Sequence, residues 1–164
     1  MKINPIQQSS TNFGANIVQT PALKEVVDYM SFHRMRPGQK DYTEHFYLWN
    51  KIEYAMLNHP SNLDIFTVVE KNMGDFGYAI GSIKTFVGEM AFKTRANQGF
   101  LRPVLSAWRD FLDPENMVRF NIIMGNRTKK EYKTWWNTFI APHWKGINKY
   151  FGDDEPKILT LVRR

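Results

Sequence analysis

The chain has 164 residues, of which 43% are hydrophobic and 15% aromatic, and this is enough to build one ordinary folded domain. It contains no cysteine, which excludes disulfides, thiolate nucleophiles and cysteine-based zinc or iron–sulfur sites. The formal net charge of +6 favours contact with polyanions through long-range electrostatics. No apolar run reaches the length of a membrane span, and residues 1–10 lack the apolar region of a secretory signal. We therefore expect a soluble, cytoplasmic protein with no transmembrane segment.

The chain begins with an arm that we expect to be irregular. Residues 1–19 contain proline, glycine and a cluster of small polar residues, which is typical of an irregular or extended segment. Within them, residues 16–19 are apolar enough to add one short strand. Thr20 followed by Pro21 is typical of a helix start, and the apolar residues behind them recur at helical steps to about Phe32. The folded domain is therefore predicted to begin at Thr20.

A second helix is expected after the break at residues 37–38. Asp41 and Glu44 stand three positions apart, as in a capping box, and an apolar stripe follows them to Asn58. Residues 63–87 are ambiguous, because β-branched runs on either side of a glycine-containing turn fit either short helices or a hairpin. We predict short helices here, since the flanking elements are helical and an isolated two-stranded hairpin is only marginally stable.

The second half of the chain has clearer helical patterns. Apolar residues line one face of residues 100–112 and polar residues line the other, which predicts a strongly amphipathic helix. Another helix is expected over residues 115–124. A third is expected to be capped by Thr128 and to break or kink at Pro142.

These elements together predict a mainly all-α fold. It consists of a single helical domain of about six helices over residues 20–152, which the arm of residues 1–19 precedes. A tail of residues 153–164 follows, and residues 157–162 within it suit a short terminal strand.

The sequence offers no pattern typical of catalysis or metal binding. The four histidines, His33, His45, His59 and His143, are never three or four positions apart, so a zinc site is not indicated. No glycine-rich nucleotide loop is present, and paired carboxylates occur only in the acidic turn at residues 153–155. We therefore predict no catalytic residue, no bound metal and no cofactor.

The most strongly charged segment of the chain lies between residues 127 and 149. It holds six lysine or arginine residues and a single acidic residue, Glu131. On a helix Trp135 and Trp136 point about 100° apart, so the two rings cannot share one environment. Both can be packed in a core, or one can serve as an exposed platform. The predicted binding surface consists of Lys133, Trp136, His143, Trp144 and Lys145.

Three stretches of the chain resemble a known family. Residues 97–114 read NQGFLRPVLSAWRDFLDP, residues 40–52 read KDYTEHFYLWNKI and residues 132–139 read YKTWWNTF. In this order along the chain they resemble the helical N-terminal domain that precedes phosphatidylserine decarboxylase-like enzymes, a group that includes L-tryptophan decarboxylases. The resemblance assigns structural motif positions to Asp41, Tyr42, Asn97, Leu105, Trp108, Phe111, Leu112 and Trp135.

The resemblance implies a stand-alone accessory or interaction domain, with a protein partner such as a decarboxylase core. The family's pyruvoyl-forming core is missing here, since the only Gly-Ser pair is Gly81 and Ser82, away from the family's self-cleavage position. Enzyme activity is therefore not expected from it. The alternative function is a small basic protein that binds single-stranded nucleic acid through residues 127–150. A third hypothesis is an enzyme whose site is assembled from scattered histidines and carboxylates.

Overall fold

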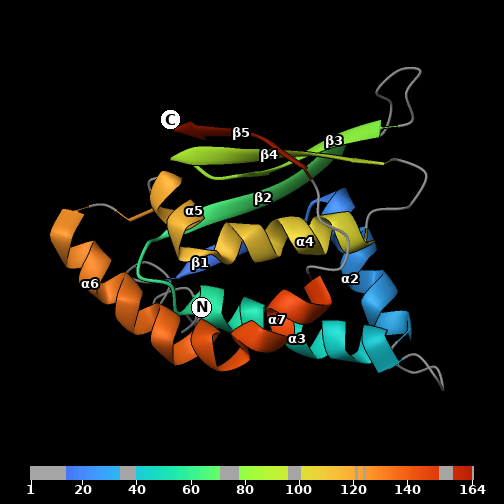
Figure 1. Cartoon of the computed structure of the whole chain (residues 1–164), viewed down its shortest axis with the longest axis horizontal. Helices are drawn as coiled ribbons and strands as arrows, with labels where there is room; N and C mark the ends of the chain where they lie inside the picture. The colour runs from blue at the N-terminus through green and yellow to red at the C-terminus, as the bar shows by residue number, and fades with distance from the viewer. Residues whose placement is uncertain are drawn as a thin grey trace, which may run out of the picture.

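A five-stranded mixed sheet with helices gathered on one side of it makes up the fold (Figure 1). The computed structural model describes residues 14–33, 40–70, 78–95, 101–120, 122–123, 125–151 and 157–163. In chain order the elements are β1 (Ala15–Val18), α2 (Pro21–His33), α3 (Lys40–Leu57), β2 (Leu63–Glu70), β3 (Tyr78–Lys84), β4 (Gly88–Arg95), α4 (Leu101–Leu112), α5 (Pro114–Arg119), α6 (Gly125–Trp135), the π-helix η3 (Trp136–Ile140), the 3₁₀ turn η4 (Ala141–His143), α7 (Trp144–Phe151) and β5 (Lys157–Arg163). The protein is thus α+β, and the predicted all-α fold is wrong.

The sheet has the strand order β1-β2-β3-β4-β5. Strands β1 and β2 are parallel, and the crossover between them is formed by α2 and α3. Strands β2, β3 and β4 form an antiparallel meander, and β5 pairs antiparallel with β4 after the helical half of the chain. The short strands expected near the two ends of the chain are therefore present, and each occupies one edge of the sheet.

The prediction of short helices over residues 63–87 is wrong, because β2 and β3 pair antiparallel with Phe66 opposite Lys84. In β2 the side chains of Leu63, Ile65 and Thr67 are buried and those between them are exposed, which is the period of a half-buried strand. A lone hairpin is marginal, but this one is flanked by β1 and β4. Strand β4 has no counterpart among the predicted elements.

One glycine in β3 permits a close contact inside the sheet. Gly81 lies opposite Phe92 of β4, and a Cβ atom at Gly81 would stand 2.4 Å from the Phe92 ring. The missing side chain therefore lets a fully buried phenylalanine lie across the neighbouring strand.

The predicted helices are largely present, with changes at their ends. Helices α2, α3 and α4 lie where apolar periodicity placed them. Helix α5 ends at Arg119, earlier than expected, and its first turn is capped by the Asp113 carboxylate, which accepts a hydrogen bond from the Glu115 N–H. Helix α6 begins at Gly125, so Thr128 lies inside the helix and the prediction that it caps the helix is wrong.

The core lies between the sheet and α3 and α4. The rings of Trp49 and Trp108 meet edge to face with centroids 5.2 Å apart, and the Trp108 indole N–H donates to the Thr67 hydroxyl at 2.9 Å. Helix α7 is joined to α4 by the Ser106 hydroxyl, which donates to the carbonyl of Phe151. The motif residues of α4 are all buried in this core, namely Leu105, Trp108, Phe111 and Leu112.

Candidate binding surface

The candidate site lies on the helical segment of residues 125–151, which we call the C-terminal arm. Its elements α6, η3, η4 and α7 follow one another directly along the chain (Figure 1). Pro142 has no N–H and cannot donate to Thr138, so the α-helical hydrogen-bond pattern cannot continue through it. Instead, the Ala141 N–H donates to the Trp136 carbonyl, five residues back, which is π-helical spacing. The break predicted at Pro142 therefore takes the form of a π-helix followed by a 3₁₀ turn.

Trp135 is a structural residue that connects the C-terminal arm to α3. Only 3% of it is exposed, and its indole N–H donates to the carbonyl of Ala55 at 2.5 Å. Its ring contacts His59 at a centroid distance of 4.6 Å and Tyr132 at 5.4 Å. The predicted difference in environment between Trp135 and Trp136 is confirmed, because Trp136 is only partly buried.

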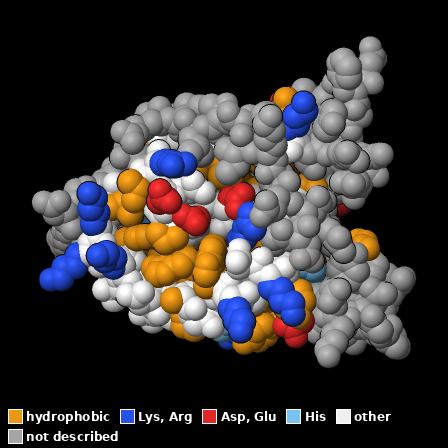
Figure 2. Space-filling model, viewed as in Figure 1, with side chains coloured by type: hydrophobic (Ala, Val, Ile, Leu, Met, Phe, Trp, Pro, Cys, Tyr) orange, Lys and Arg blue, Asp and Glu red, His pale blue; other side chains and the backbone are white. Residues whose placement is uncertain are grey.

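Trp136 and Trp144 form an aromatic pair on the arm. Their centroids are 5.0 Å apart with an interplanar angle of 62°, and both side chains keep part of their surface in solvent. Lys129 and Lys133 of α6 precede Trp136, the first residue of η3, by seven and three positions, so helical spacing places the three residues on one side of the C-terminal arm. Figure 2 shows hydrophobic side chains gathered where α6 meets α4 and α5, with lysine or arginine side chains along the α6 side.

The structure divides the predicted binding surface. Trp136 and Trp144 lie together, and Lys133 and Lys145 are exposed, but His143 packs against Tyr47 of α3, with ring centroids 6.2 Å apart. Partial burial lowers the pKa of His143, and the nearby Lys51 lowers it further. His143 is therefore neutral at physiological pH and adds no positive charge to the surface.

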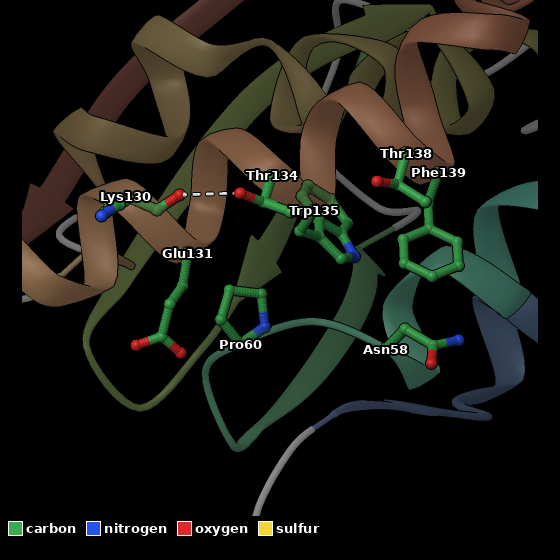
Figure 3. A pocket seen from close by; sticks show the side chains of 8 residues that line it. All are labelled: Asn58, Pro60, Lys130, Glu131, Thr134, Trp135, Thr138 and Phe139. Carbon is green, nitrogen blue, oxygen red and sulfur yellow. Dashed lines mark hydrogen bonds between the residues drawn. The ribbon is translucent and has the colours of Figure 1, made fainter.

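A second feature is a pocket between the arm and the loop that follows α3. It has a volume of about 360 Å³ and is lined mainly by apolar surface. Figure 3 shows Trp135 at its centre with Thr134 and Phe139 on either side, and Pro60 and Asn58 opposite. Its lining consists of Asn58, Pro60, Lys130, Glu131, Thr134, Trp135, Thr138 and Phe139.

Sequence reasoning did not anticipate the part that α3 plays here. Tyr47, Lys51 and Tyr54 recur at steps of four and three on the side of α3 away from its apolar stripe, and both tyrosines are at least half exposed. Tyr54 contacts Phe139 of the arm at a centroid distance of 5.7 Å, next to the pocket. A search for aromatic residues on the polar face of the predicted helix would have found them.

Two buried polar side chains, His59 and Tyr132, contact the Trp135 ring that lines the pocket. The Nδ1 atom of His59 accepts the Ser61 N–H at 3.0 Å, so its Nε2 carries the proton of the neutral ring. Neither His59 Nε2 nor the Tyr132 hydroxyl has a hydrogen-bond partner among the described residues. Burial lowers the pKa of His59 to about 4 and raises that of Tyr132. Both side chains are therefore uncharged at neutral pH.

The remaining motif residues add no site. Asp41 and Tyr42 lie in the first turn of α3, but their side chains, like the whole of Asn97, are outside the described part of the chain.

No protein-family model, curated protein or solved structure matches this chain. Over the described ranges, no three histidine, aspartate or glutamate side chains are grouped to hold a metal ion. The same ranges contain no helix long and apolar enough to cross a bilayer.

Proposed function

We propose that this protein is a small basic module that binds single-stranded nucleic acid through the C-terminal arm. The observation that carries the proposal is the distribution of charge. The arm holds six lysine or arginine residues and one glutamate, which amounts to five of the six net positive charges of the chain. Charge concentrated on one helical segment attracts a polyanion more strongly than the same charge spread evenly.

The aromatic pair supplies the second part of the proposal. Single-stranded nucleic acid is held by lysine contacts to phosphates together with stacking of bases on aromatic rings. Trp136 and Trp144 are each partly buried rather than enclosed, and each orders the other by edge-to-face contact. The exposed lysines near them in the chain are Lys129, Lys130, Lys133, Lys145 and Lys149.

A fluorescence anisotropy titration with labelled single-stranded oligonucleotides tests this function. The variant Lys129→Gln/Lys133→Gln removes two charges beside Trp136 and is expected to weaken binding. The control Lys24→Gln/Lys93→Gln removes the same charge from α2 and β4, where Lys24 and Lys93 are exposed. Equal losses in both variants would show that net charge alone attracts the strand and would refute a site on the arm.

A non-catalytic accessory domain of the decarboxylase-associated type is the second candidate. The observation in its favour is that the α4 motif residues and Trp135 all have the buried, structural positions that the resemblance implies. The five-stranded sheet weighs against it, because the resemblance implies a helical domain. Co-expression with a decarboxylase core, followed by size-exclusion chromatography, tests this candidate, and separate elution of the two proteins would contradict it.

A further inference from the structure

The pocket beside Trp135 has a fixed aromatic wall. The hydrogen bond from its indole N–H to Ala55 and the contact with His59 hold the Trp135 ring in one orientation. Phe139, which the π-helix carries, contributes a second ring that is itself packed against Tyr54. Both rings are therefore ordered before any ligand arrives, which reduces the entropy lost on binding.

Hydrogen-bonding side chains stand around this aromatic wall. The Thr134 hydroxyl donates to the Lys130 carbonyl at 3.3 Å, so its oxygen lone pairs remain able to accept. The Asn58 amide nitrogen donates to the Tyr54 carbonyl at 2.9 Å, which leaves its side-chain oxygen as an acceptor. With the Thr138 hydroxyl, the rim can both accept and donate hydrogen bonds at the edge of a planar ligand.

The charge at the pocket favours a ligand with an anionic group. Lys130 lines the pocket and is exposed, and the exposed Lys129 and Lys133 lie close to it on α6, outside the lining. Glu131 lines it with the opposite charge, and Figure 3 shows both the Glu131 carboxylate and the Lys130 nitrogen directed away from Trp135. The volume of about 360 Å³ is near the lower end of the range for ligand pockets, so it suits one ring system and its substituents.

We propose that this pocket binds the base of a single nucleotide, with the base against Phe139 and the small exposed part of Trp135 and its phosphate towards Lys130. The nucleotide comes either from the strand held by the arm, in which case the inference rests on the proposed function, or from a free nucleoside monophosphate. The recognition chemistry is the same in both cases. An unstacked base held by aromatic contacts and by hydrogen bonds to its edge is the usual mode of single-strand recognition.

Isothermal titration calorimetry with the four nucleoside 5′-monophosphates and with short homopolymer oligonucleotides tests the inference. Thr134→Trp places a bulky side chain at an exposed rim position. Asn137→Trp is the matched control, because Asn137 is exposed on the same segment but does not line the pocket. Any stacking on an added surface tryptophan occurs in both variants, so the difference between them reports the pocket. Thr138→Trp blocks a second rim position if Thr134→Trp fails to fold.

We expect Thr134→Trp to weaken ligand binding by about ten-fold or more, and Asn137→Trp to leave it within about two-fold of the parent chain. A loss for monophosphates identifies a free nucleotide as the source, and a loss for oligonucleotides alone identifies the strand. Parent-like binding of both ligands by Thr134→Trp would overturn the inference, as would a parent chain that binds neither. If Lys129→Gln/Lys133→Gln weakens oligonucleotide binding while Thr134→Trp does not, the pocket assignment fails and the proposed function stands.

Discussion

Acidification is expected to destabilise this protein through His59, a buried histidine that is neutral in the native state. His59 is 1% exposed, and burial lowers its pKa from 6.5 to about 4. Between these two values the unfolded chain binds a proton at His59 that the native protein does not bind. The free energy of unfolding therefore falls as the pH falls from 6.5 to about 4. Below about pH 4, protonation of His59 causes no further change in it.

The magnitude follows from the size of the pKa shift. A shift of about two and a half units corresponds to about 3 kcal/mol of stability lost between neutral pH and pH 4. Urea unfolding followed by tryptophan fluorescence at a series of pH values measures this loss. His59→Asn keeps an acceptor for the Ser61 N–H but cannot be protonated, so its stability is expected to vary much less over the same window. Parallel loss of stability in the parent chain and in His59→Asn would refute the assignment to His59.

Two further predictions concern the tryptophans of the arm. Trp135→Ala is expected to cost about 3–5 kcal/mol in the free energy of unfolding, measured in urea, because a buried indole and its contacts with α3 are removed. A cost below about 1 kcal/mol would contradict the role of Trp135 in fastening the arm. Trp136→Leu/Trp144→Leu is expected to keep the fold, as checked by circular dichroism, and to lose about 1–3 kcal/mol of oligonucleotide binding for each base that no longer stacks. Unchanged affinity in this variant would exclude the aromatic pair from the site.

The helical half of the chain could be predicted from the sequence because its signals are local. The apolar face of α4 is complete within twelve residues, and every apolar position on it from Val104 to Leu112 is buried. The two tryptophans at Trp135 and Trp136 could likewise be separated by helical geometry alone. The Pro142 break could be predicted from the missing N–H, although its form as a π-helix could not.

The sheet could not be predicted with the same reasoning because two of its four strand pairings join partners distant in sequence. Strand β2 pairs with β1 about fifty positions earlier, and β4 pairs with β5 about seventy positions later. The alternation of buried and exposed residues in β2 covers only residues 63–67 of the strand and does not reveal these neighbours. The same limit applies to the pocket, since Asn58 and Trp135 meet only through tertiary packing, and no local pattern places them together.

The salt dependence of oligonucleotide affinity tests the central claim most directly. If the exposed lysines of the arm contact phosphates, the logarithm of the binding constant falls linearly with the logarithm of salt concentration, with a slope of about −0.7 for each phosphate neutralised. We predict a slope of about −3 for the parent chain, from about four contacts, and a slope shallower by about 1.4 for Lys129→Gln/Lys133→Gln. The Lys24→Gln/Lys93→Gln control is expected to keep the parent slope. Absence of binding by the parent chain would contradict the assignment of nucleic-acid binding to the C-terminal arm. The same slope in the parent chain and in both double variants would also contradict it.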